Sequence, residues 1–132
     1  MGLFDKVFKS QRDISKEEIT EVPWHPLTDQ NQIEVIKEES KERTVVVFKH
    51  STRCGISRMV LNTFEKEVDV KTGEEFKLYF LDLIANRGVS NEIADHFDVR
   101  HESPQMLIIK EEKVVHHASH HSISATDIEE YL

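Results

Sequence analysis

The chain contains a single cysteine, and the residues around it could support nucleophilic sulfur chemistry. Cys54 follows an apolar, β-branched run and precedes a segment with helical spacing, so we expect it where a buried strand passes into a helix. At such a junction a thiol lies among unpaired backbone N–H groups and at the positive end of the helix dipole, which favours the thiolate. Lys49, His50 and Arg53 add positive or polar character nearby. Ser57 follows in the first helical turn, where its hydroxyl could donate to the sulfur or cap the helix.

A free cysteine that is buried as a small hydrophobe is the alternative interpretation of Cys54. The polar neighbours and the predicted strand end favour the reactive role, because ligands and chemistry gather at the carboxyl ends of strands in an open α/β sheet. A second feature is the dipeptide Ser103-Pro104, which directly precedes another predicted strand. Proline is tolerated at the start of a strand, and an ordinary trans turn is the default interpretation of any X–Pro bond.

Four histidines near the C-terminus suggest a metal hypothesis. A helix would bring residues four apart onto one face, whereas a strand would separate them by roughly 13 Å and turn neighbours to opposite faces. The preceding Val114-Val115 pair indicates a strand followed by a loop. We therefore expect a packing or surface role and no metal for His116, His117, His120 and His121.

The hydrophobic spacing switches between helical and strand-like periods along the chain. Helices are expected from Thr28 or Asp29 to about Ser40, from Ile56 through Val68, from a Ser90 cap through Phe97, and from a Ser124 or Thr126 cap to Leu132. Strands are expected over residues 44–48, 76–81 and 106–109, and from Val114 onward. Two prolines flank Trp24 in the segment 22–26, which indicates a loop whose indole packs onto the body of the protein.

This order of elements predicts an α/β fold. Strands that are separated by helices form parallel pairs, whereas the short polar turn at 110–113 requires an antiparallel pair. We expect a mixed sheet of four strands, or of five, flanked by helices on both faces. Residues 1–26 are interpreted as an N-terminal extension and loop that pack on the body, and residues 27–132 as the domain. The extension carries an apolar set that we expect to fold back on the core or to fray: Leu3, Phe4, Val7 and Phe8.

Composition narrows the function further. The chain has 132 residues, 25 acidic and 17 basic, with a net charge of −8. An anionic excess repels phosphate backbones and argues against nucleic acid as a partner. No apolar run reaches the length of a membrane span, and the first eight residues lack an apolar signal core. One cysteine forms no internal disulfide, so we expect the reducing cytosol as the compartment. We also expect the protein to act as a monomer.

The order strand, Cys-x-x-Ser, helix, strand, helix, Ser-Pro, hairpin and helix resembles the thioredoxin fold. More narrowly, the chain resembles the YtxJ-type monothiol bacilliredoxins, which are cytosolic proteins of bacillithiol-making bacteria. The resemblance runs from about Trp24 to the C-terminus. The matching stretches are Phe48-Lys49-His50-Ser51-Thr52-x-Cys54-x-Ile56-Ser57, Asn86-Arg87-x-x-Ser90, Val99-Arg100-His101-Glu102-Ser103-Pro104-Gln105 and His117-Ala118-Ser119-His120.

The resemblance implies a role for each residue of the site. Cys54 would be the attacking thiol, Pro104 a cis-proline that faces it, and Ser103 would present its backbone to a substrate. The active-site loop departs from the family pattern, because members read Thr-Cys-Pro-Ile-Ser whereas this chain reads Arg53-Cys54-Gly55-Ile56-Ser57. Gly55 restores an N–H that can point at sulfur, and Arg53 adds a cation, so both changes favour the thiolate.

The implied activity is that of a monothiol thiol-disulfide oxidoreductase that removes bacillithiol from S-bacillithiolated proteins through a mixed disulfide on Cys54. It requires no metal and no bound cofactor, and bacillithiol would be the co-substrate. Ser57 occupies the place of a resolving cysteine and cannot displace a sulfur. Two other functions stay open: an iron–sulfur carrier that holds its cluster between two subunits, and a thioredoxin-like binding module in which the cysteine is incidental.

Overall fold

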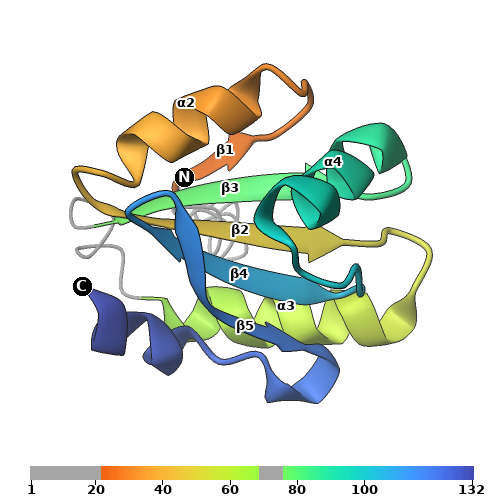
Figure 1. Ribbon diagram of the computed structural model, residues 1–132. Coiled ribbons are helices and arrows are strands. Elements are labelled where there is room, and N and C mark those ends of the chain that lie inside the picture. The colour runs from red at the N-terminus through yellow and green to blue at the C-terminus, as the bar shows by residue number, and fades with distance from the viewer. Residues whose placement is uncertain (1–21, 69–75) are drawn as a thin grey trace, which may run out of the picture.

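A mixed five-stranded sheet forms the centre of the computed structural model, which describes residues 22–68 and 76–132 (Figure 1). The strands are β1 (Trp24–Pro26), β2 (Thr44–His50), β3 (Phe76–Asp82), β4 (Gln105–Lys110) and β5 (Lys113–Ser119), in the spatial order β1-β3-β2-β4-β5. β1, β3 and β2 run parallel, and β4 is antiparallel to both β2 and β5. The expected α/β class and the mixed sheet are confirmed, and the sheet has five strands rather than four.

β2 is the central strand, and all seven of its residues are buried. Its β-branched run suits a strand that is covered on both faces. Val46 pairs with Leu78 of β3 on one side and with Ile108 of β4 on the other. The backbone of β2 is thereby fixed by two neighbours before the chain reaches the segment that carries the cysteine.

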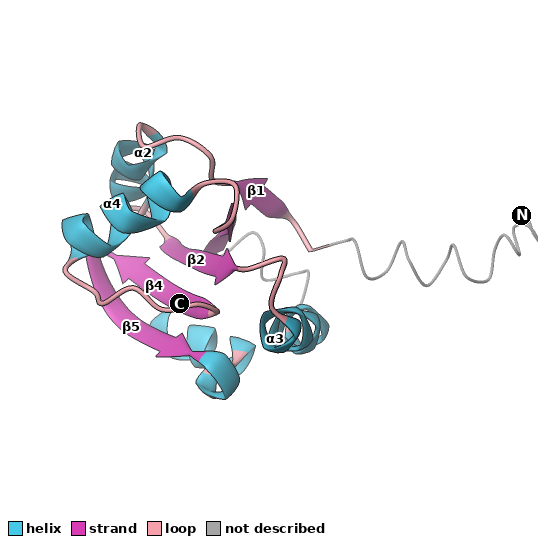
Figure 2. Ribbon diagram, turned by 90° about the vertical axis from the view of Figure 1, so that its right-hand side faces the viewer, coloured by secondary structure: helices cyan, strands magenta, loops and turns pink. Residues whose placement is uncertain are grey.

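Helices cover both faces of the sheet (Figures 1 and 2). α2 (Gln32–Glu39) and α4 (Arg87–Phe97) lie on one face, and α3 (Gly55–Glu67) lies on the other with a 3-10 helix, η3 (Ala125–Tyr131). Side chains of β2 alternate between the two cores. Val45 and Val47 pack with Ile36 and Ile93 on the first face, and Val46 and Phe48 pack with Val60, Phe64 and Ile128 on the second.

The segment around Trp24 forms an edge strand, so the expectation of a loop at residues 22–26 was wrong. Trp24–Pro26 pairs with β3 alone, and proline is compatible with an edge strand because one side of it makes no ladder hydrogen bonds. The expected packing of the indole is confirmed: the ring of Trp24 stacks on Phe64 with centroids 5.8 Å apart. The division of the chain at residue 27 stays a prediction, and the apolar set at residues 3–8 lies outside the described residues.

Three helices differ from their expected form. α4 begins at Arg87, so Ser90 lies inside the helix, fully buried, and does not cap it. The C-terminal helix is a 3-10 helix, with Ser124 as its N-cap: the Ser124 hydroxyl accepts from the N–H of Thr126. α2 begins at Gln32, after the residues that were expected to cap it.

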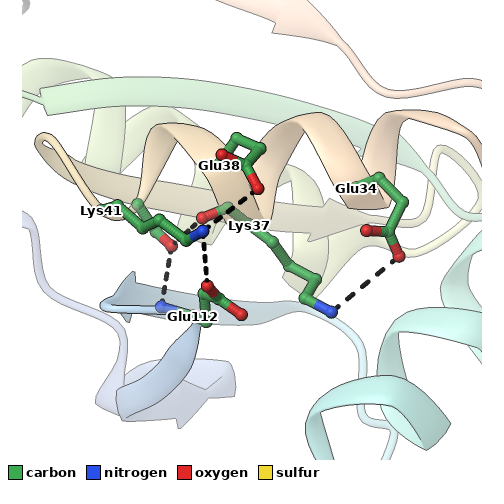
Figure 3. A network of polar contacts seen from close by, with 6 residues as sticks. Glu34, Lys37, Glu38, Lys41 and Glu112 are labelled. Carbon is green, nitrogen blue, oxygen red and sulfur yellow. Dashed lines mark hydrogen bonds and ion pairs between the residues drawn. The ribbon is translucent and has the colours of Figure 1, made fainter.

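A polar network fastens the β4–β5 turn to the end of α2, at the sheet edge where β2 begins (Figure 3). The carbonyl of Ser40 accepts from the N–H of Glu111 at 2.8 Å, and the Ser40 hydroxyl accepts from the N–H of Glu112 at 2.9 Å. Lys41 forms ion pairs with Glu112 at 3.0 Å and with Glu38 at 3.2 Å. We refer to Ser40, Lys41, Glu38 and Glu112 as the Lys41 network.

Within residues 22–68 and 76–132, no helix has the length and apolar character that crossing a membrane requires.

Candidate functional site

The sheet topology brings the two predicted site segments to the same end of the sheet, where β2 finishes and β4 starts. β2 and β4 are antiparallel, and Lys49 near the end of β2 pairs with Gln105 at the start of β4. Cys54 follows β2 through a short loop, and Ser103-Pro104 directly precedes β4. The peptide bond between Ser103 and Pro104 is cis, as the resemblance implied.

Cys54 is the N-cap residue of α3, at the strand–helix junction that the sequence predicted (Figure 2). Its backbone is extended, with φ −109° and ψ 121°, and its side chain makes no capping hydrogen bond. The free thiol is half-buried, so the interpretation as a fully buried structural cysteine does not fit. The first N–H groups of a helix have no partner within the helix, and Cys54 directly precedes these donors in the chain.

Three neighbours of Cys54 are exposed. Arg53 and Gly55 flank it in sequence, and a side chain added at Gly55 would meet nothing within 4 Å. Ile56 is 45% exposed, and Met59 one turn later is 53% exposed. The thiol thus has a cationic side chain, an open position and an apolar surface around it.

Ser57 is fully buried, and its hydroxyl is bonded toward the end of β2. The Ser57 hydroxyl accepts from the N–H of Ser51 at 3.0 Å and lies 2.8 Å from Nδ1 of His50. Which of the two atoms donates in the second contact depends on the tautomer of His50. In the described structure the Ser57 hydroxyl makes these two contacts and does not donate to the sulfur of Cys54, as the sequence had suggested it could. Ser57 instead joins α3 to β2.

His50 is the partner that makes this connection possible. It is 5% exposed, and its carbonyl accepts from the N–H of Leu83 at 2.8 Å, which joins it to the end of β3. Burial lowers the pKa of His50, with Arg58 acting in the same direction and Asp82 opposing it. The ring is therefore neutral at pH 7. We refer to His50, Ser51 and Ser57 as the His50 clamp, since it holds the loop that ends at Cys54.

Lys49 points to the opposite face of the sheet, where it meets a second polar group. It is fully buried, and its Nζ donates to the carbonyl of Ser90 at 3.3 Å and lies 3.3 Å from Nδ1 of His101. The Ser90 hydroxyl lies 3.0 Å from the same Nδ1. We refer to Lys49, Ser90 and His101 as the Lys49 cluster. Sequence reasoning missed it because 41 and 52 residues separate Lys49 from its partners, although all three lie in stretches that carried the family resemblance.

The loop before β4 is held by the side chain of Gln105, the first residue of that strand. Gln105 is buried; its amide donates to the carbonyl of Arg100 at 2.9 Å and accepts from the N–H of Glu102. The carbonyl of Pro104 accepts from the N–H of His120 at 3.0 Å. The Ser103 hydroxyl is buried and has no hydrogen-bond partner among the described residues. A buried hydroxyl without a partner is uncommon, and this one lies beside the cis peptide bond.

The histidines near the C-terminus fall on β5 and on a following 3-10 turn, η2 (His120–Ser122). His116 lies 3.2 Å from a carboxylate oxygen of Asp127 and packs against the ring of Tyr131. Across the described parts of the chain, no three histidine, cysteine, aspartate or glutamate side chains come together in a metal-binding group.

Comparison with protein families gives one match over most of the chain. A family model described as monothiol bacilliredoxin BrxC matches residues 25–128. The match includes the cysteine loop, the Lys49 cluster and the cis-proline loop.

Solved structures give the same fold. A thioredoxin-fold protein described as a candidate oxidoreductase is 29% identical, with a TM-score of 0.69, over 82% of this chain and 92% of that chain. The thioredoxin Mala s 13 of Malassezia sympodialis is 16% identical over 80% and 84% of the two chains, with a TM-score of 0.61. The thioredoxin of Fasciola hepatica is 24% identical over 80% and 93%, with a TM-score of 0.59. At these last two identities the likeness concerns the fold alone.

Proposed function

Since the chain belongs to the monothiol bacilliredoxin family, we propose that it removes bacillithiol from S-bacillithiolated proteins by thiol–disulfide exchange at Cys54. The family and the thioredoxin fold support a redox function. The choice of bacillithiol and the monothiol course of the reaction are our proposal.

One observation carries the proposal. The only cysteine of the chain is half-buried at the N-terminus of α3, on the edge where the cis Ser103–Pro104 bond precedes β4. Exchange requires an accessible sulfur that can ionise and a clear line of attack. A helix N-terminus supplies backbone donors to a thiolate, and the half-exposed side chain leaves room for an incoming disulfide.

In the first step the Cys54 thiolate attacks the bacillithiol sulfur of a protein–bacillithiol disulfide. A new disulfide forms between Cys54 and bacillithiol, the old disulfide breaks, and the substrate protein leaves as a thiolate that takes up a proton. The substrate cysteine is thereby reduced, and the adduct is transferred to Cys54.

A second thiol must complete the cycle, because Ser57 stands where a resolving cysteine would be and holds an oxygen that cannot displace sulfur. Free bacillithiol, or a cysteine of a partner protein, attacks the mixed disulfide. Cys54 leaves as a thiolate, and the attacking thiol keeps bacillithiol as a new disulfide. The substrate proteins and bacillithiol are the partners of this cycle, and no metal or bound cofactor takes part.

The flanking residues have separate roles in the proposal. Arg53, next to Cys54 in the chain, would add positive charge near the sulfur, and the N–H groups of Gly55 and Ile56 in the first turn of α3 are available to donate to a thiolate. Ser103 presents its backbone to the bound disulfide, next to Pro104. We place the reaction in the cytosol, where thiols are kept reduced, with the protein acting as a monomer.

Adduct transfer followed by mass spectrometry of the intact chain tests the proposal. A protein carrying one bacillithiol adduct is mixed with an equal amount of this chain, and both masses are followed in time. We expect the bacillithiol mass to leave the substrate and to appear on Cys54. A substrate that keeps its adduct in the presence of the folded chain would refute the proposal.

Two controls define what the transfer means. Cys54→Ser must leave the adduct on the substrate, because the fold retains every residue except the nucleophile. A parallel substrate that carries glutathione measures the preference between small thiols: faster transfer of bacillithiol supports the proposed substrate, and equal rates refute that part of the proposal.

A further inference from the structure

Lys49 is a buried cation whose contacts include no carboxylate in the described structure. It is 0% exposed, in the middle of the sheet, and its Nζ contacts only the carbonyl of Ser90 and the ring of His101. Burial lowers the pKa of Lys49 to about 8, so at pH 7 the side chain is mostly charged. A buried charge without a counter-charge is costly. A lysine at this position therefore needs an explanation other than stability.

The contacts of Lys49 fix the proton of His101. An ammonium group donates and cannot accept, so the Nδ1 atom that faces Lys49 at 3.3 Å must be unprotonated. The pKa of His101 is lowered by burial and then by Lys49 and Arg87, with Glu102 opposing them, so the ring is neutral. Its single proton is then on Nε2. The Ser90 hydroxyl could either donate to Nδ1 or accept from it, and only Lys49 determines which.

His101, whose tautomer and position are fixed by Lys49, belongs to the loop that precedes β4. It lies between Arg100, whose carbonyl accepts from Gln105, and the dipeptide Ser103-Pro104. Side chains anchor the loop at both ends, the Lys49 cluster at its start and the Gln105 amide at its end, and the N–H of His120 bonds to the carbonyl of Pro104. The buried Ser103 hydroxyl has no partner in the described structure, and it does not anchor the loop.

We propose that Lys49 is a positioning residue, which acts through His101 to hold the loop 100–104 in the arrangement that receives the substrate disulfide. The proposal rests on the proposed function. It means that residues on the α4 face of the sheet help to shape the substrate site on the other side. Lys49 does not contact the sulfur in this arrangement. It determines the tautomer and position of His101, and His101 determines the start of the loop.

The His50 clamp makes the effect of Lys49 separable from that of the cysteine. His50 and Lys49 are adjacent on β2 but point to opposite faces, and their hydrogen bonds share no residue. Loss of the Lys49 amine should therefore weaken substrate binding while the intrinsic reactivity of Cys54 is retained.

Lys49→Met is the test, because methionine has a similar length and is compatible with burial. Lys113→Met, at an exposed position of β5, is the matched control. Three quantities are measured for each at pH 7: KM and kcat for transfer from a bacillithiolated peptide, the rate of Cys54 alkylation by iodoacetamide, and the ¹⁵N shifts of the His101 ring.

For Lys49→Met we expect kcat/KM to fall by about tenfold or more, mainly through KM. The alkylation rate should stay within about twofold of the wild-type rate, since the His50 clamp is intact. The His101 ring should change from one Nε2–H tautomer to a mixture of tautomers. Lys113→Met should change none of the three.

Two results would overturn the inference: a transfer rate in Lys49→Met equal to the wild-type rate, or an alkylation rate that falls as much as the transfer rate. Ser90→Ala provides a second variant should Lys49→Met fail to fold. It removes one hydroxyl and keeps the carbonyl that Lys49 contacts, so a smaller rise in KM in the same direction is expected, and an unchanged KM contradicts the inference.

The His101 spectrum also separates this inference from the proposed function. A wild-type chain that transfers no adduct refutes the function, yet the tautomer in the wild type and its change in Lys49→Met still decide whether Lys49 controls His101. Conversely, an active wild type with a mixed tautomer leaves the function standing and refutes the inference.

Discussion

The two ends of β2 use lysine in opposite ways. Where the strand begins, Lys41 is exposed and is paired with Glu38 and Glu112, and these carboxylates raise its pKa (Figure 3). Where the strand ends, Lys49 is fully buried, has no carboxylate partner in the described structure, and has a lowered pKa. The exposed ion pairs of Lys41 cost little desolvation and contribute little to stability, because water screens ion pairs at the surface. The buried, uncompensated charge of Lys49 opposes folding.

This difference between the two ends of β2 indicates that stability is sacrificed at the end that carries the cysteine. The end of β2 that carries the cysteine holds buried polar residues on both faces of the sheet, Lys49 on one and His50 on the other. The end with the Lys41 network holds its charges in solvent. Costly features in a locally consistent fold concentrate at functional sites, and the buried Lys49 and His50 lie at the end of the sheet that carries Cys54.

The largest expected effect comes from removing the nucleophile at the functional end. Cys54→Ser should lower the transfer of bacillithiol by at least about a thousandfold, because no other thiol is present to attack. The free energy of unfolding should change by less than about 1 kcal/mol, since the side chain is half-buried and makes no capping hydrogen bond. Adduct transfer and urea denaturation measure the two quantities.

Ser57→Ala should have the next largest effect, because it opens the His50 clamp. The change leaves Nδ1 of His50 and the N–H of Ser51 without a partner, which costs about 1–3 kcal/mol. Alkylation of Cys54 should slow by about two- to tenfold as the loop before it loosens. Thr63→Ala removes an exposed hydroxyl from the same helix and is the control; equal losses in the two variants would contradict the clamp.

Lys49→Met tests whether the buried charge opposes folding. At pH 7 we expect the variant to be as stable as the wild type or more stable, by up to about 2 kcal/mol. Between pH 8 and 10.5 the folded wild type has lost the Lys49 proton while the unfolded chain still holds it. Wild-type stability therefore rises with pH in this window, and the advantage of the variant should shrink there. Denaturation curves at pH 7 and pH 10 measure the trend, and a growing advantage would contradict it.

Gly55→Pro should have a smaller and favourable effect. Gly55 is the first residue of α3, so its N–H takes no part in the hydrogen bonds of the helix and proline is tolerated there. Cys54 before it is already extended, which is the conformation that a residue before proline favours. The open space around Gly55 accommodates a ring. We expect a gain of about 0.4–1 kcal/mol in the free energy of unfolding. Gly55→Ala is the control for side-chain volume, and a loss of stability in the proline variant alone would show that the Gly55 N–H has a partner.

Lys41→Ala should have the smallest effect and completes the comparison. The ion pairs of Lys41 are exposed, so its loss should shift the melting temperature by less than about 2 °C. The transfer of bacillithiol should not change. The small shift should vanish in 1 M salt, and a salt-independent loss would mean that the Lys41 network contributes more than charge.

The element order and the position of Cys54 could be predicted because both depend on local signals. The apolar run of β2 and the helical spacing after it place the cysteine at their junction without any knowledge of the fold. β1 was missed because three residues, one of them proline, are too few to show the alternation of apolar and polar residues that marks a strand. The cis bond before Pro104 came from the resemblance and not from physical reasoning, because proline alone favours trans.

The partners of Ser57, Ser90 and Lys49 could not be predicted for a different reason. Ser57 is close to Cys54 in sequence, yet its helical position turns it toward the core and away from the sulfur. Ser90 looks like a cap because serine is common there, whereas its hydroxyl serves His101, which is far along the chain. Contacts of this kind depend on the sheet order, and the sheet order follows from the whole chain.

The alternation of Lys49 and His50 also determines how β2 is registered in the sheet. The run Val45–Val47 is apolar toward both faces, so over these residues a slip of one position exchanges valine for valine, and only the packing of Phe48 against Phe64 opposes it within the apolar run. The same slip would turn the ammonium group toward Phe80 and the imidazole toward α4, and every hydrogen bond of both would be lost. The polar pair therefore helps to fix the register of a strand whose three valines do not fix it. A chain with leucine at both positions should gain apolar burial and lose the uniqueness of its strand pairing.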